Sequence, residues 1–259
     1  MKITILTDNF AGAYFFAEHG LSYLIETDNF KLLWDTGATD IFIKNAEKLN
    51  INLEDIKTVA LSHGHWDHGN GLINLKNKTL ITHPNSFIKR FRRSNNEYLG
   101  LNLSITEIKQ KFNLKTSTKP YEINKNIIFL GEIPRKFEFE NWQTPYKDEF
   151  KNDDFIIDDT ALVIIENNEL NIVTGCSHSG ICNITEYAKK ITGINKINTI
   201  IGGFHLKKAN EHTFKTVEYF KSQSIKQLLP AHCTQLPALA KFFDEFNIEQ
   251  IKTGMIINI

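Results

Sequence analysis

A histidine-rich loop after a short apolar strand constrains this chain more than any other feature. It places four potential metal ligands within six residues: His63, His65, Asp67 and His68. His63 and His65 lie two residues apart, so an extended backbone points both side chains the same way. His68 follows three residues later, which suits the first turn of a helix, and Asp67 can reach a second ion. Imidazole and carboxylate ligands suit Zn, Fe or Mn, so the loop predicts a transition-metal centre.

The pattern of apolar residues around this loop indicates a mixed α/β chain. Runs at 3–6, 22–26, 31–34 and 57–61 predict strands, and the turn-rich residues 27–29 favour a hairpin at a sheet edge. Helical spacing occurs at 40–49. After residue 159 a hairpin over 161–174 is followed by helices at 183–191, 212–221 and 236–246, with strands at 199–201, 225–229 and 248–259. We therefore expect a single domain over 1–259 in which helices cover mixed sheets.

The region 84–155 departs from this regular alternation. It holds a basic, aromatic stretch at 88–93, a short helical pattern at 106–112 and few strand signals after 137. Long irregular segments in compact domains often have a function, so we interpret this region as a lid-like insertion. The alternative is an irregular surface loop.

Composition narrows the class of protein and its partners. Of the 259 residues 41% are hydrophobic, and 30 basic residues balance 30 acidic ones, so disorder is excluded and neither a nucleic-acid nor a membrane partner is indicated. Three cysteines are an odd and sparse set that does not resemble a secreted disulfide framework. The first residues lack the apolar run of a signal peptide, and no stretch approaches the ~20 apolar residues of a membrane span. A cytoplasmic location is expected.

The loop resembles the hallmark His-x-His-x-Asp-His of the metallo-β-lactamase superfamily, matched at 63–68. That family places an Asp at the end of an earlier strand to support the metal loop, and Asp35 matches it, although Asp35 alone could be a turn residue before Gly37. Segments 131–135, 174–180, 201–206 and 230–234 are similar to the branch named for 7,8-dihydropterin-6-yl-methyl-4-(β-D-ribofuranosyl)aminobenzene 5'-phosphate synthase. The resemblance implies an αββα sandwich with a dinuclear metal site at one edge of its sheets.

The resemblance also implies a set of ligands. His63 and His65 would hold one ion, Asp67 and His68 the other, and His232 takes the place of the family's last histidine. The chain departs from the family in two places: no histidine precedes the hairpin at 161–174, and Cys176 stands where a bridging Asp is usual. His178 is the expected replacement. Cys176, or an Asp within 153–159, is an alternative ligand, and each later histidine alone could be an ordinary loop residue.

These ligands predict a metal-dependent hydrolase, or a transferase that displaces phosphate or diphosphate, with a metal-activated water as nucleophile. Asp67 and His205 are the expected catalytic residues, and two divalent ions, zinc before iron or manganese, are the expected cofactors. A signalling or binding protein with little turnover is the main alternative. A diiron redox relative is another, but such relatives usually replace the second histidine of the loop by Glu, and His65 is retained.

The expected substrate is a small, anionic or phosphorylated molecule. The basic stretch places Arg90, Arg92 and Arg93 one strand and a turn after the metal loop. A guanidinium group binds two phosphate oxygens at once, so at least one of these arginines is expected to contact the substrate. The alternative is a solvated charged face. The sequence leaves the oligomeric state unassigned.

Overall fold

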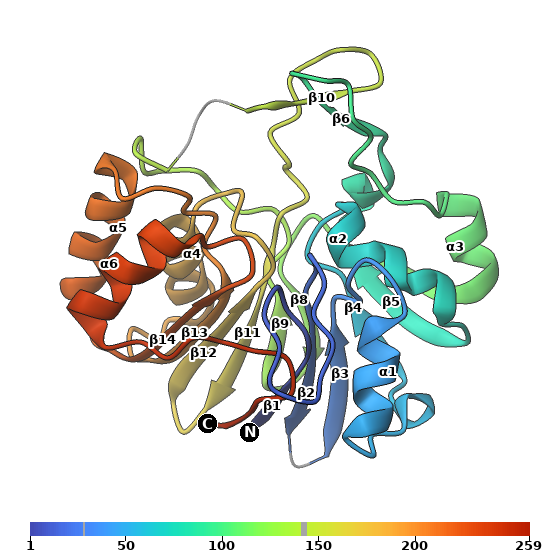
Figure 1. The fold of residues 1–259 in the computed structure, drawn as a ribbon, viewed down its shortest axis with the longest axis horizontal. Coiled ribbons are helices and arrows are strands. Elements are labelled where there is room, and N and C mark those ends of the chain that lie inside the picture. Colours follow the sequence, from blue (N-terminus) through green and yellow to red (C-terminus); the bar gives the residue numbers. More distant parts are fainter. Residues whose placement is uncertain (28, 141–143) are drawn as a thin grey trace. The chain divides into compact units, whose positions relative to one another are not determined.

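A computed structural model describes residues 1–27, 29–140 and 144–259 (Figure 1). Part of the predicted turn at 27–29 and residues 141–143 of the expected lid lie outside the described residues. The chain forms two compact units. The first comprises Met1–Ser117, Pro145–Asp154 and Ile251–Ile259, and the second Thr118–Thr144 and Phe155–Gln250.

The first unit is built on a seven-stranded sheet in the order β15-β1-β2-β3-β4-β5-β7. Its strands are β1 (Lys2–Thr7), β2 (Ser22–Thr27), β3 (Phe30–Trp34), β4 (Thr58–Ala60), β5 (Lys78–Thr82), β7 (Phe112–Thr116) and β15 (Ile256–Asn258). Its helices are α1 (Ile41–Lys48), α2 (Trp66–Gly69) and α3 (Ile105–Lys111), with 3-10 turns η1 (Leu53–Asp55), η2 (Asn70–Asn74) and η3 (Pro84–Phe87). Phe42 of α1 and Ile108 of α3 pack in one apolar core with Leu33 and Val59 of the sheet.

The predicted hairpin of β2 and β3 forms, but not at a sheet edge. β1 pairs with β2 on one side, and β4 pairs with β3 on the other, so the hairpin lies inside the sheet. Neighbouring residues Tyr23 and Leu24 point to opposite faces of β2, and both are fully buried. An edge was the wrong expectation because each strand of the hairpin has a second partner, β1 from before the hairpin and β4 from beyond α1.

The expected insertion at 84–155 is narrower than the sequence suggested. The predicted helix is α3, which begins with a capping box between Ser104 and Glu107. β7 extends the sheet of the first unit, while β8 (Tyr121–Asn124) and β9 (Ile127–Phe129) belong to the second unit. The remaining regular piece is a separate ribbon of β6 (Arg90–Arg92) and β10 (Tyr146–Asp148), paired antiparallel.

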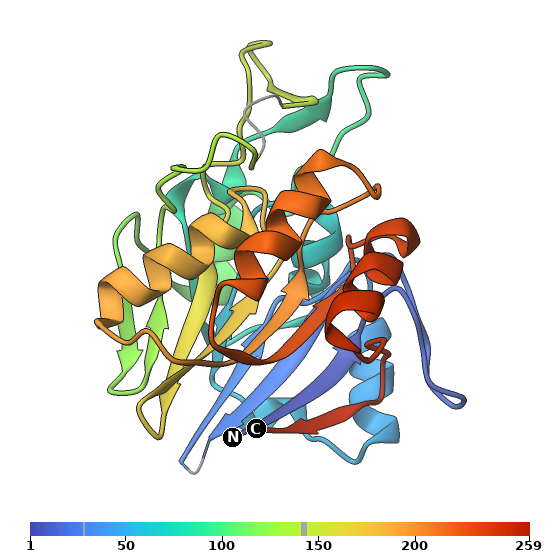
Figure 2. The ribbon, with the colours of Figure 1, turned by 90° about the vertical axis from the view of Figure 1, so that its left-hand side faces the viewer.

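The second unit is a six-stranded sheet in the order β14-β13-β12-β11-β9-β8, with α4 to α6 on one face (Figures 1 and 2). The remaining elements are β11 (Ala161–Glu166), β12 (Glu169–Thr174), α4 (Ile181–Thr192), β13 (Ile197–Gly203), α5 (Glu211–Lys221), β14 (Ile225–Ala231) and α6 (Leu236–Phe246). Ile184, Phe220 and Phe242, one from each helix, share an apolar core with the strands. The predicted hairpin is confirmed, with Asn167 and Asn168 both left-handed at its turn.

Helix α4 begins without a local cap. Its N-cap residue is Gly180, and no side chain there accepts a hydrogen bond from the first turn. The carboxylate of Glu140 does so instead, because it accepts hydrogen bonds from the backbone N–H groups of Cys182 and Asn183, each at 2.7 Å. A Cβ at Gly180 would lie 2.2 Å from this carboxylate, so the glycine leaves space for it. Among the described residues, no helix has the length and apolarity that crossing a bilayer requires.

Candidate metal centre

The histidine-rich loop leaves the end of a central strand and runs straight into α2. β4 ends at Ala60, and α2 begins at Trp66, whose backbone N–H donates to Leu99 O at 3.1 Å. Gly64 is required in between, since a Cβ at this position would lie 1.9 Å from the carbonyl oxygen of Ser86. The loop is therefore held at both ends and tightly packed in its middle.

Three imidazole rings of this loop meet in the first unit. His63 Nε2 lies 2.9 Å from His65 Nδ1, and the ring centres of His63 and His68 are 4.3 Å apart. All three side chains are buried. Burial lowers the pKa of His63 well below its ordinary value, and the neighbouring His68 and His65 lower it further. A neutral imidazole is the form that binds a metal ion, so the site favours the ligand-competent state.

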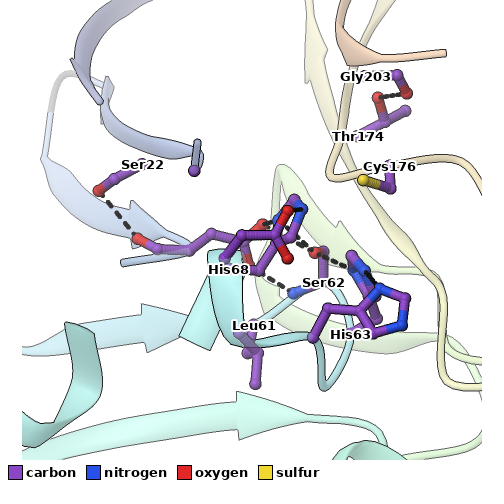
Figure 3. A network of polar contacts seen from close by, with 12 residues as sticks. Ser22, Leu61, Ser62, His63, His68, Thr174, Cys176 and Gly203 are labelled. Carbon is purple, nitrogen blue, oxygen red and sulfur yellow. Dashed lines mark hydrogen bonds and ion pairs between the residues drawn. The ribbon is translucent and has the colours of Figure 1, made fainter. Parts of the chain in front are cut away.

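Asp35 holds this group of histidines in place through the polar contacts around Ser62 and His68, the two residues of this set that Figure 3 labels beside His63. Its Oδ1 accepts the backbone N–H of Ser62 at 2.7 Å, and its Oδ2 accepts the Ser62 hydroxyl at 2.7 Å. Oδ2 also lies 2.7 Å from His68 Nδ1. A carboxylate on Nδ1 fixes the proton there and leaves Nε2 for an ion, as is usual for metal-binding histidines. The predicted role of Asp35 in supporting the loop is confirmed.

Asp67 faces two histidines. Its Oδ2 lies 3.9 Å from His68 Nε2 and 3.2 Å from Nε2 of His19, whose side chain is about half exposed. No motif in the sequence includes His19, which lies far from the loop along the chain. Tyr146 of the β6–β10 ribbon was missed for the same reason, and its ring lies 5.1 Å from that of His65. Both contacts depend on folding.

The other predicted histidines follow parallel strands of the second unit. His178 comes after β12, His205 after β13 and His232 after β14, so all three lie at one edge of that sheet. The rings of His178 and His205 are 4.3 Å apart. Arg135, from the segment that resembles the synthase branch, donates to the carbonyl oxygen of His178 at 3.1 Å. The structure thus gathers four predicted ligands in the first unit and two in the second.

The acidic alternatives at 153–159 have other contacts. Asp159 Oδ2 accepts the backbone N–H of Ser179 at 2.9 Å and also its hydroxyl, and burial raises the pKa of Asp159 to about 6. These contacts favour a role in holding the loop of His178. Asp153 forms an ion pair with Arg93, and Asp154 lies 3.2 Å from Arg90 Nε.

The three arginines of the basic stretch each have an acidic partner within the first unit. Arg90 is fully buried beside Asp154, whereas Arg92 and Arg93 are partly exposed. Arg92 Nε lies 2.9 Å from a carboxylate oxygen of Glu97. The substrate contact stays a prediction, and a bound anion would have to replace these partners.

Comparison with known proteins identifies the family to which the chain is similar. Residues 16–84 match the model of the metallo-β-lactamase superfamily. An uncharacterized protein of Methanocaldococcus jannaschii is 37% identical over 99% of this chain and 100% of its own length. The 7,8-dihydropterin-6-methyl-4-(β-D-ribofuranosyl)-aminobenzene-5'-phosphate synthase of the same organism is 34% identical, over 99% of this chain and 96% of its own. The solved structure of Tm1679, a metal-dependent hydrolase of the β-lactamase superfamily, superposes with a TM-score of 0.88 at 30% identity, over 100% and 99% of the two chains.

A mixed α/β fold with this histidine loop defines an enzyme of the metallo-β-lactamase fold, and the chain belongs to the metallo-β-lactamase superfamily. Within it, the chain is similar over nearly its whole length to the M. jannaschii synthase. The predicted fold class and the predicted resemblance to this branch are confirmed. Members of the superfamily usually bind divalent metals and act on small molecules, and both units carry candidate metal-binding side chains.

Proposed function

We propose that the protein is a metal-dependent hydrolase, or a transferase that displaces phosphate or diphosphate, acting on a small phosphorylated molecule. The observation that supports it most is the contact between Asp35 and His68. A buried carboxylate next to a buried histidine fixes the tautomer of that histidine. This arrangement is typical of histidines that bind a metal ion. The neutral form of His63 in the same loop fits the same role.

The proposed ligands hold two divalent ions, zinc before iron or manganese. They are His63, His65, Asp67, His68, His178 and His232. The donor set suits such ions, because neutral imidazoles and one carboxylate are what zinc binds in catalytic sites. The cysteine thiols are not part of this ligand set.

The chemistry follows from these residues. Bound divalent ions would lower the pKa of a coordinated water from ~15.7 toward ~7 and neutralise negative charge on a reacting phosphate or oxyanion. Asp67 takes part as ligand and orients the attacking water. His205, at the end of β13, donates a proton to the leaving group. The β6–β10 ribbon, which touches His65 through Tyr146, serves as the lid.

The phosphorylated substrate rests on two supports. The first is the M. jannaschii synthase, which is named for a 5'-phosphate. The second is the partly exposed pair Arg92 and Arg93, which are the candidates for contact with the phosphate. Each arginine would release its present partner, Glu97 or Asp153, and bind the phosphate instead.

The test is turnover of the metal-reconstituted protein on phosphomonoesters, phosphodiesters, diphosphates and thioesters. His63→Ala should lose both metal and turnover. Lys215→Ala is the control, since Lys215 is exposed on α5 and pairs with Glu211 of the same helix, and it should keep both. A wild type that holds metal but turns over none of these classes would favour the binding-protein alternative. A wild type that holds no metal after reconstitution would exclude both.

A further inference from the structure

A second group of potential ligands lies within the second unit alone. One ligand atom each from Cys176, His205 and Cys233 lies within 4.8 Å of the other two. Cys176 is buried, and the other two are half-buried. Neither thiol belongs to the ligand set proposed above.

The fold of this unit brings these residues together. β12, β13 and β14 are parallel neighbours, so the segments that follow them leave the same edge of the sheet. Gly203, the last residue of β13, lies between the two cysteines. A Cβ at Gly203 would lie 2.5 Å from Cys233 Sγ and 3.2 Å from Cys176 Cα. The bare backbone at this position therefore leaves room for the thiol to approach Cys176.

Two further observations indicate that this edge accommodates a ligand. Ser177, His205 and His232 are left-handed, with φ of 57°, 52° and 49°. Such a conformation is costly for a serine or a histidine, and three such residues cluster at this edge. In addition, Nδ1 of His205 is buried and has no hydrogen-bond partner among the described residues. A buried polar atom of this kind calls for an ion or a water.

We propose that Cys176, His205 and Cys233 form a site for a thiophilic divalent ion, with zinc as its natural occupant. In a tetrahedral zinc site, bonds of ~2.3 Å to sulfur and ~2.0 Å to nitrogen set the ligand atoms about 3.5–3.8 Å apart. The observed ligand atoms lie within 4.8 Å of one another, so each pair has to approach by about 1.3 Å at most, which side-chain rotation supplies. The thiol of Cys233 now lies 3.5 Å from the carbonyl oxygen of Cys176, and it would turn from that oxygen to the ion.

The consequence is a soft metal site that one unit carries by itself. Two thiolates and one imidazole leave the fourth position of a tetrahedral ion open, as in catalytic zinc sites. His205 would bind the ion through Nδ1 and keep its proton on Nε2, so it can still donate that proton as proposed above. The inference does not rest on the proposed hydrolytic function, because both thiols lie outside the ligand set proposed above and the test does not use turnover.

The test is titration of the metal-free protein with Co²⁺ under a phosphine reductant, which keeps the thiols reduced. The wild type should develop the near-ultraviolet charge-transfer absorption of thiolate-bound cobalt. Cys176→Ser and Cys233→Ser should each lose this absorption. Cys182→Ser is the matched control, because Cys182 lies within α4 of the same unit and outside the group, and it should keep the absorption. His63→Ala should also keep it, whatever happens to turnover.

A second measurement needs no variant. Zn²⁺ should protect Cys176 and Cys233 of the wild type from alkylation, read by peptide mass spectrometry, while labelling of Cys182 does not change. The inference is wrong if the charge-transfer absorption is absent from the wild type or survives in both Cys→Ser variants of the group. It is equally wrong if zinc leaves alkylation of both cysteines unchanged.

Discussion

The contact between Asp35 and His68 makes the sharpest prediction, through the variant Asp35→Asn. The carboxylate of Asp35 serves three donors, namely Ser62 N, Ser62 Oγ and His68 Nδ1, all at 2.7 Å. An amide of the same shape has one acceptor oxygen and one NH₂ group. If the oxygen keeps the backbone N–H of Ser62, the NH₂ group faces His68. The ring must then carry its proton on Nε2, where it blocks binding of an ion.

The size of the effect follows from these contacts. Loss of a partner that orients a metal-binding histidine costs roughly 10–100-fold in metal affinity, which is about 1.4–2.8 kcal/mol. Hydrogen bonds to a charged group contribute about 1.5–3 kcal/mol each. In the variant all three donors or acceptors face a neutral amide, whose hydrogen bonds contribute only about 0.5–1.5 kcal/mol each. The free energy of unfolding of the metal-free variant should therefore be about 3 kcal/mol lower than that of the wild type. Both changes come from one buried carboxylate.

The assay is competition for Zn²⁺ with a chromogenic chelator, together with urea unfolding of the metal-free protein. Asp40→Asn is the matched control, because the half-exposed side chain of Asp40 pairs with Lys44 at the start of α1. It should change neither quantity by more than a few tenths of a kcal/mol. An Asp35→Asn protein that binds zinc within about twofold of the wild type would refute the tautomer argument, even if it were less stable.

Three further outcomes are expected. His178→Ala should lose one of the two proposed ions and turnover with it, whereas Asp158→Ala should keep both by elemental analysis; retention in the His178 variant would move the ligand role to a neighbour. Burial raises the pKa of Glu140 from 4.5 to about 7. The folded state therefore binds the proton of Glu140 more tightly than the unfolded state does. The free energy of unfolding should fall by about 3 kcal/mol as the pH rises from 4.5 to 7. Glu140→Gln should flatten that fall in urea unfolding of the metal-free protein. Arg90→Ala should cost about 3–5 kcal/mol in the same assay, because Asp154 then stays buried without its cation, and a cost below 1 kcal/mol would contradict this.

Local patterns in the sequence predicted most elements of the fold. The runs that became β1 to β4, the β11–β12 hairpin and α4 to α6 carry apolar residues at the period of their own structure, so nearby residues suffice to identify them. The last residues of the sequence show where prediction from local patterns fails. Residues 248–259 look like one strand, but only Ile256–Asn258 form one, against β1, while Thr253 makes an isolated bridge to Ala11. Where pairing ends depends on that distant partner.

The candidate site likewise has residues that the sequence identifies and residues that only the fold brings together. The histidine loop is visible in the sequence because its ligands are close together along the chain, and Asp35 was found through the family pattern. His19 and Tyr146 reach Asp67 and His65 only through the fold, so no spacing could identify them. The group of Cys176 and Cys233 was hidden for another reason. The feature that brings the thiols together is the missing side chain of Gly203, which in a sequence looks like any other glycine.

Backbone strain links these separate observations. Asp35, Ser177, His205 and His232 each follow a strand, and each is left-handed, with φ between 49° and 57°. A left-handed residue turns the chain off the strand end in one step, so a side chain there lies over the edge of the sheet. Glycine would make the same turn without strain but would bring no ligand. Each residue costs about 1–3 kcal/mol, and four together approach the whole net stability of a typical domain. Six of the other eight left-handed residues besides glycine that the structure describes are asparagines, for which this conformation is common. The four at strand ends instead bring a proposed ligand, or a residue beside one, to the edge of each sheet.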